Sequence, residues 1–174
     1  MSAYRYSEMT AGACFRAAFL SLLVLLAAPS SYADQRGIPV ADNLAELGHL
    51  SLQQDIPVIV FVSRDACPYC RTLREQILKP MLTAGKFEQR AILAEVSLDR
   101  NEPLTGFENS PMTAQAFAED YQAGITPTLL FLDSRGLEIS KRRVGISNLE
   151  LYGYYLQKSI DEALQAIRSE EPKG

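Results

Sequence analysis

Two cysteines, Cys67 and Cys70, form a C-x-x-C motif directly after an apolar run and directly before a stretch with helical periodicity. The run, 58–62, is continuously apolar and rich in β-branched residues, which is typical of a central strand covered on both faces. A helix that begins after this strand places Cys67 at its N-terminus, where unpaired backbone amides and the helix dipole favour an anion. Because a thiolate is such an anion, the pattern indicates a thiol–disulfide redox centre.

Apolar periodicity in the rest of the chain predicts helices and strands that alternate around this motif. In chain order we expect a helix capped by Asp42, a helix from the cysteines to Gly85, a strand at 91–98, a loop at 99–111, a short helix at 112–121, a strand at 128–132, its hairpin partner at 137–144 and a final helix from Ser147. This order favours an α/β fold with a central mixed β-sheet and helices on both faces.

Three local signals refine these elements. Pro80 is expected to kink or end the helix that follows the cysteines, because proline has no amide hydrogen to donate. Ser147 and Glu150 form a capping box, in which a hydroxyl and a carboxylate satisfy two free amides. The basic run 141–143 suits an exposed edge strand, where charge discourages aggregation.

The first 33 residues have the pattern of a cleavable signal peptide. An uncharged apolar run at 17–28 follows two arginines, and Ser31-Tyr32-Ala33 fits the small-x-small rule for cleavage. The run is shorter than the roughly 20 residues that a membrane-spanning helix needs, and an uncleaved anchor is the alternative interpretation. The chain therefore divides into a signal peptide at 1–33, a flexible mature N-terminus at 34–41, one domain at 42–168 and a flexible tail at 169–174.

Cleavage after Ala33 would remove Cys14 and leave Cys67 and Cys70 as the only cysteines of an exported chain. A structural disulfide framework uses more cysteines at wider spacing. A zinc site needs two further ligands, whereas the chain has one histidine, His49, so we expect no metal site. The formal charge of −4, without a basic patch interleaved with aromatic residues, argues against nucleic-acid binding.

The predicted order of elements, with C-x-x-C after the first core strand, resembles the thioredoxin fold over residues 42–168. A second marker is Gly124–Asp133, with the sequence GITPTLLFLD, which resembles the family's cis-proline strand. The resemblance is strongest to exported bacterial thioredoxin-like proteins, which include periplasmic thioredoxins and the catalytic domains of periplasmic disulfide isomerases. The motif CPYC also matches glutaredoxins, which rarely carry a signal peptide or such a long N-terminal helix, so they rank second.

The resemblance implies that Cys67 is the nucleophile that attacks a substrate disulfide, and that Cys70 resolves the resulting mixed disulfide. It also implies a cis peptide bond before Pro127, so that the backbone of Thr126 faces the substrate beside Cys67. The alternatives are a structural disulfide clip and a trans proline. No cofactor is expected beyond the redox-active Cys67–Cys70 disulfide. The wall of the active site would then consist of Pro68, Tyr69, Thr126 and Pro127.

The chain departs from common thioredoxins in the residues that handle protons. It has no tryptophan, and the family's buried aspartate and lysine fall at Phe61 and Glu95. We hypothesise that Glu95, a partly buried carboxyl with a raised pKa, accepts the proton of Cys70 during resolution. The alternative is a solvent-facing glutamate on an alternating strand.

These features predict a monomeric periplasmic thiol–disulfide oxidoreductase that reduces protein or small-molecule disulfides. A reductant outside the cytoplasm needs electrons from across the membrane, so a membrane thiol donor is the implied partner. The alternatives are an oxidant or isomerase of disulfides and a non-enzymatic chaperone or metal-handling assembly factor, since two thiols could hold copper(I). The motif sets neither the substrate nor the reduction potential, which spans roughly −270 to −120 mV across this fold.

Overall fold

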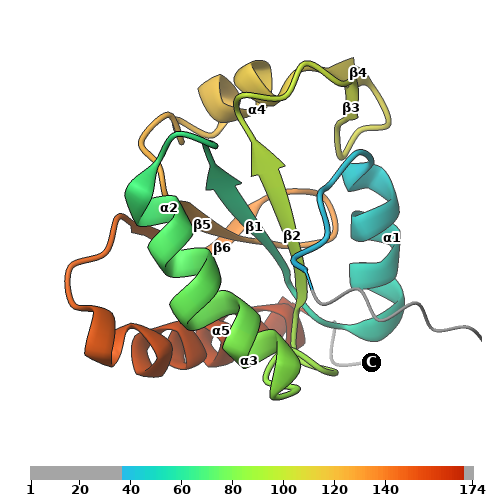
Figure 1. Ribbon diagram of the computed structural model, residues 1–174. Coiled ribbons are helices and arrows are strands. Elements are labelled where there is room, and N and C mark those ends of the chain that lie inside the picture. The colour runs from blue at the N-terminus through green and yellow to red at the C-terminus, as the bar shows by residue number, and fades with distance from the viewer. Residues whose placement is uncertain (1–36, 171–174) are drawn as a thin grey trace, which may run out of the picture. The chain divides into compact units, whose positions relative to one another are not determined.

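The computed structural model describes residues 37–170 (Figure 1). The expected signal peptide at 1–33 and the last residues, 171–174, lie outside the described part of the chain.

Four strands form one mixed sheet in the order β2-β1-β5-β6. β1 (Val58–Ser63) pairs in parallel with β2 (Ile92–Ser97) and antiparallel with β5 (Thr128–Leu132). β6 (Glu138–Val144) pairs antiparallel with β5 and ends the sheet on that side. The predicted mixed sheet is thus confirmed, with β1 in an interior position between two neighbours.

The apolar run of β1 is explained by two clusters of side chains, one on each face of the sheet. Every residue of β1 is 0% exposed. Ile59 and Phe61 pack in the cluster with Cys70 and the buried side chains of α5, whereas Val60 and its neighbours at alternate positions pack in the cluster with Phe117 of α4. The helices of the first face are α2 (Pro68–Leu73) and α5 (Leu149–Glu170), and those of the second are α1 (Leu44–Gln54) and α4 (Ala114–Asp120) (Figure 1).

The helix after the cysteines continues past Pro80, so of the two predicted effects, a kink or an end of the helix, the end does not occur. It consists of α2, a π-helical turn η1 (Arg74–Leu78) and α3 (Lys79–Thr83). In the π turn the amide of Lys79 donates to the carbonyl of Arg74, one residue further back than in an α-helix. The wider turn directly before Pro80 accommodates a residue without an amide. The helix ends before Gly85, which adopts a positive φ of 66°, as expected.

The segment predicted as a loop at 99–111 contains a small hairpin. β3 (Leu104–Thr105) and β4 (Pro111–Met112) pair antiparallel as a separate two-stranded sheet. α4 therefore starts later than the predicted residue 112. Thr113 caps it, because its side-chain oxygen accepts from the amide of Ala116 at 3.0 Å.

The residues before the first helix are held against the sheet. The amide of Glu95 donates to the carbonyl of Pro39, and the amide of Ala41 donates to the carbonyl of Glu95, each at 2.8 Å. Residues 39–41 of the segment expected to be flexible are therefore bound along the free edge of β2. The cap of α1 is Asn43 rather than Asp42, since Asn43 Oδ1 accepts from the amide of Glu46 at 3.1 Å.

α5 is also capped one residue later than the sequence predicts. Asn148 Oδ1 accepts from the amide of Leu151 at 3.1 Å, in the position expected for Ser147. The helix extends through Glu170, so the first part of the predicted flexible tail is helical. None of the helices between residues 37 and 170 combines the length and the apolar character that crossing a membrane requires.

Candidate active site

Cys67 and Cys70 lie at the start of α2 and are joined by a disulfide bond, with their Cα atoms 5.2 Å apart. Cys67 is the N-cap residue, and its Sγ accepts from the amide of Cys70 at 3.1 Å. Pro68 occupies the first turn of the helix, where no amide is lost. Cys67 is partly exposed and Cys70 is fully buried, so a substrate sulfur can reach only Cys67. The amide aimed at Cys67 Sγ would also stabilise its thiolate.

The segment before β5 lies against the disulfide. The Thr126–Pro127 peptide bond is cis, the geometry that the thioredoxin resemblance implies. The carbonyl oxygen of Thr126 lies 3.7 Å from Cys67 Sγ. The carbonyl of Pro127 accepts from the amide of Gly145 at 2.8 Å, which fixes the segment after β6 beside it. The fold therefore brings residues 67, 126 and 145 to one place.

Large apolar side chains are exposed next to each of these segments. Tyr69 is 65% exposed and Ile125 is 70% exposed. Val144, directly before Gly145, is also exposed. Tyr69 is predicted from the sequence to line the site, whereas Ile125 and Val144 are not, although Ile125 directly precedes Thr126. Exposed apolar groups beside a reactive sulfur favour an extended, partly apolar polypeptide as the ligand.

Glu95 is buried and bound by a cation. The whole residue is 6% exposed, so the alternative of a solvent-facing glutamate is wrong. Arg74 Nε donates to Oε2 at 3.2 Å, while Arg74 Nη2 and the Ser63 hydroxyl both donate to Oε1. Phe61, the register partner of Glu95 on β1, has its ring centroid 5.4 Å from the Arg74 guanidinium.

The arginine of this network was missed by the sequence analysis. Arg74 stands four residues after Cys70 on the same continuous helix, so it lies on the same side of it. Its hydrogen bond with Glu95 raises the pKa of Arg74 above its ordinary value, outweighing the effect of burial. Glu95 is an acidic residue in a strand that is otherwise largely apolar. Because a buried charge needs a partner of opposite charge, Glu95 could have indicated a nearby cation from the sequence alone.

The loop before the cysteines is fixed by Asp99, which follows β2. Asp99 Oδ2 accepts from the amide of Asp65 at 2.7 Å, and Asp99 Oδ1 lies 3.4 Å from Arg64 Nη1. The Asp65 amide bond is the more important contact, since exposed ion pairs contribute little. Asp99 therefore positions the loop that carries Cys67.

His49 is exposed on α1, whose apolar side packs in the cluster on the opposite face of the sheet from Cys70. Within residues 37–170, no group of three or more histidine, cysteine, aspartate or glutamate side chains is arranged to hold a metal ion.

The fold and the site define a protein of the thioredoxin fold with a C-x-x-C disulfide at the N-terminus of α2, the helix that follows β1. Comparison with protein families agrees, since a thioredoxin-like domain matches residues 49–166, more than half of the chain. The chain belongs to this thioredoxin-like domain family.

Several solved structures are similar to this chain at low sequence identity. A structure described as DsbH oxidoreductase superposes with a TM-score of 0.53 at 20% identity, covering 74% of this chain and 85% of its own. Thioredoxin from Fasciola hepatica gives 0.49 at 20% identity, covering 72% and 99%. The oxidised C-terminal domain of DsbD from Neisseria meningitidis gives 0.45 at 18% identity, covering 66% and 90%. None of the curated proteins compared matches the chain.

Proposed function

We propose that the protein is a periplasmic thiol–disulfide oxidoreductase that reduces disulfides of protein substrates through Cys67 and Cys70. One observation carries the proposal: the partly exposed Sγ of Cys67 lies at a helix N-terminus, bonded to a buried Cys70 and 3.7 Å from the Thr126 carbonyl. This is the geometry that a nucleophile, a resolving thiol and a substrate-facing backbone need.

The reaction starts from the reduced dithiol. The Cys67 thiolate attacks one sulfur of the substrate disulfide, which forms a mixed disulfide and releases the first substrate thiol. Cys70 then loses its proton and attacks Cys67 Sγ, which releases the second substrate thiol and leaves the Cys67–Cys70 disulfide. The substrate gains two electrons and the protein loses them, so a thiol donor must reduce the disulfide again. We propose a membrane thiol protein for this step and no cofactor besides the cysteine pair.

The proton of Cys70 needs an acceptor during resolution, and Glu95 is the candidate. It is buried in the sheet next to the active-site helix, and its partner Arg74 lies one helical turn from Cys70. Proton acceptance at Glu95 would have to compete with its hydrogen bonds to Arg74 and Ser63.

The proposed location rests on the sequence of residues 1–33, with its apolar run and small-x-small site. The structure described as DsbH oxidoreductase carries the same fold, which is compatible with disulfide chemistry but assigns no compartment. We propose that the protein reduces substrate disulfides and does not introduce them.

The test is reduction of insulin disulfides by the pure protein, with dithiothreitol as the electron source. We expect turnover that is lost in Cys67→Ser and that stops at the mixed disulfide in Cys70→Ser. The reduction potential of the pair in a glutathione buffer fixes the direction, and a value near −270 mV supports a reductase. Absence of turnover together with tight copper(I) binding would contradict the proposed enzyme activity and support a metal-handling function instead.

A further inference from the structure

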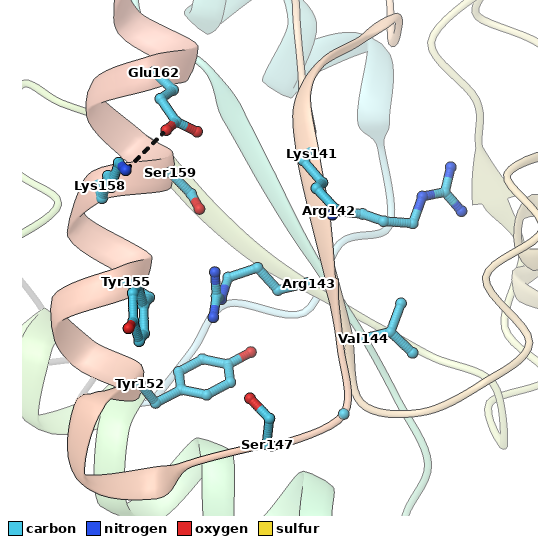
Figure 2. A pocket seen from close by; sticks show the side chains of 11 residues that line it. Lys141, Arg142, Arg143, Val144, Ser147, Tyr152, Tyr155, Lys158, Ser159 and Glu162 are labelled. Carbon is cyan, nitrogen blue, oxygen red and sulfur yellow. Dashed lines mark ion pairs between the residues drawn. The ribbon is translucent and has the colours of Figure 1, made fainter.

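A pocket of about 440 Å³ lies between the edge strand β6 and helix α5 (Figure 2). Its volume is within the range of small-ligand sites. Basic and hydroxyl side chains from both elements line it, among them Lys141, Arg143, Ser147, Tyr152, Tyr155 and Lys158.

Arg143 is the central cation of this pocket. Its guanidinium points from β6 toward α5 and lies between two tyrosine rings (Figure 2), 5.0 Å from the centroid of Tyr152 and 5.6 Å from that of Tyr155. Such contacts hold the planar guanidinium in a fixed orientation. The neighbouring Arg142 points away from the pocket and is bound by Glu138. Arg143 has no carboxylate partner among residues 37–170, and its buried Nε has no hydrogen-bond acceptor.

A second polar group at the pocket is also without a partner. The hydroxyl of Tyr152 is buried, makes no hydrogen bond, and points into the space between Arg143 and Ser147 (Figure 2). Burial raises the pKa of Tyr152 above its ordinary value and outweighs the opposite effect of the nearby Arg143 guanidinium, so the hydroxyl keeps its proton at neutral pH. Two unsatisfied groups in one pocket, one a cation and the other a donor, are matched by an acceptor with negative charge.

The charge of the pocket contrasts with that of the whole chain, which is −4. Lys141 adds positive charge beside Arg143, whereas Lys158 is paired with the acidic residue of the lining. The one acidic lining residue, Glu162, is already engaged, with Lys158 Nζ 4.0 Å from its Oε1 and the Ser140 hydroxyl 3.5 Å from its Oε2. Cations distributed along two elements suit several carboxylates of an extended segment better than a single small ion.

One end of the pocket adjoins the redox site. Val144, Gly145 and Ser147 line this end. The amide of Gly145 donates to the carbonyl of Pro127 at 2.8 Å, and the preceding carbonyl, that of Thr126, faces Cys67 Sγ. A polypeptide whose disulfide lies at Cys67 therefore has a short path from the sulfur into the pocket.

We propose that this pocket binds acidic side chains of the disulfide-bearing protein substrate, with Arg143 as the principal ligand of a carboxylate. The inference rests on the proposed function for the identity of the occupant, since it names the substrate class of the same site. It makes the protein selective for disulfides that are followed or preceded by acidic residues.

The test compares two short disulfide-free peptides by calorimetry, one with three glutamates and one with glutamines at the same positions, and adds inorganic phosphate as a third probe. We expect the oxidised protein to bind the acidic peptide about tenfold more tightly than the neutral one, because charged hydrogen bonds are the stronger ones. Arg143→Gln should remove this preference, and Arg143→Lys should retain part of it. Arg168→Gln is the matched control, since Arg168 is an exposed residue of α5 that does not line the pocket.

The same two sequences, each with an added disulfide, then serve as substrates. We expect a higher kcat/KM for the acidic substrate in the wild type and a loss of that advantage in Arg143→Gln, whereas Arg168→Gln should keep the advantage. Equal binding of both peptides, or binding of phosphate without the acidic peptide, would overturn the inference. If acidic binding through Arg143 is present but neither disulfide is reduced, the proposed function fails and the carboxylate site stands. If both disulfides are reduced equally, the proposed function stands and the inference fails.

Discussion

Arg74 and Glu95 form an ion pair behind the Cys67–Cys70 disulfide, with side chains that are 21% and 8% exposed. The arginine comes from the active-site helix and the glutamate from β2, and both carboxylate oxygens accept from the guanidinium. The thioredoxin resemblance places an aspartate at 61 and a lysine at 95, so this chain has an anion on the neighbouring strand and an apolar ring in place of the aspartate. A pair of opposite charges therefore still lies behind the cysteines, but here the cation is Arg74 of the active-site helix and the anion is Glu95 of β2.

We expect Arg74→Met to lower the free energy of unfolding by about 3 kcal/mol, because it leaves a buried carboxylate without its cation. The double variant Arg74→Met/Glu95→Gln should recover most of this loss, since neither charge then remains. Urea denaturation of the oxidised proteins measures both values. Lys79→Met, which breaks the more exposed i,i+4 pair with Glu75, is the control and should cost only about 0.5 kcal/mol. Equal losses at Arg74 and Lys79 would contradict a special role for burial.

Glu95→Gln separates proton transfer from the first chemical step. We expect attack of Cys67 on a small aromatic disulfide to keep its rate, while resolution by Cys70 slows about tenfold because its proton acceptor is lost. Stopped-flow detection of the two released thiols distinguishes the steps. Glu138→Gln removes a carboxylate from β6 and should change neither. An unchanged resolution rate in Glu95→Gln at every pH would exclude Glu95 as the proton acceptor.

The elements that position the cysteines could be predicted from the sequence, because their signals are local. The apolar run of β1, the C-x-x-C motif and the stop at Gly85 each depend on a few neighbouring residues. The position of Pro80 shows the limit of such rules. Local rules predict that Pro80 disturbs the helix, but the π turn before it accommodates a residue without an amide hydrogen, and the helix continues.

Side-chain pairs between distant segments could not be predicted in the same way. Arg74 and Glu95 are 21 residues apart and meet only because the active-site helix lies over β2. Gly48 gives a second case, since a glycine inside a helix is unfavourable by local rules alone. In the fold, a Cβ at Gly48 would collide with the carbonyl oxygen of Ser134, so the glycine permits close approach of α1 to the turn between β5 and β6. Arg143 is a third case. The basic run 141–143 predicts an edge strand, but it does not predict that Arg143 contacts the rings of Tyr152 and Tyr155.

Two neighbouring substitutions test the start of α5. Asn148→Ala should lower the free energy of unfolding by about 1 kcal/mol, because the amide of Leu151 loses its acceptor. Ser147→Ala is the matched control and should change stability by less than about 0.5 kcal/mol. Thermal or urea denaturation gives the comparison. A larger loss of stability in Ser147→Ala than in Asn148→Ala would instead support the capping box that the sequence predicts.

Tyr121, directly after α4, connects the end of that helix to the turn between β5 and β6 and makes stability depend on alkaline pH. Its hydroxyl donates to the carbonyl of Gly136 at 2.6 Å, and burial, with nearby acidic residues, raises the pKa of Tyr121 to about 12. A tyrosine in the unfolded chain has a pKa of about 10. Because the folded-state pKa is the higher one, the stability gained from the neutral phenol is fully present below pH of about 10 and is lost as the pH rises toward 12.

The variant that isolates this effect is Tyr121→Phe. At pH 8 it should be less stable than the wild type by about 1 kcal/mol, because the bond to Gly136 is missing. Between pH 10 and 12 the wild type should lose stability faster, so the two proteins converge. Urea denaturation at a series of pH values measures the difference, and lysine titration cancels because both proteins contain the same lysines. A constant difference across this range would mean that Tyr121 ionises equally in the folded and unfolded chains.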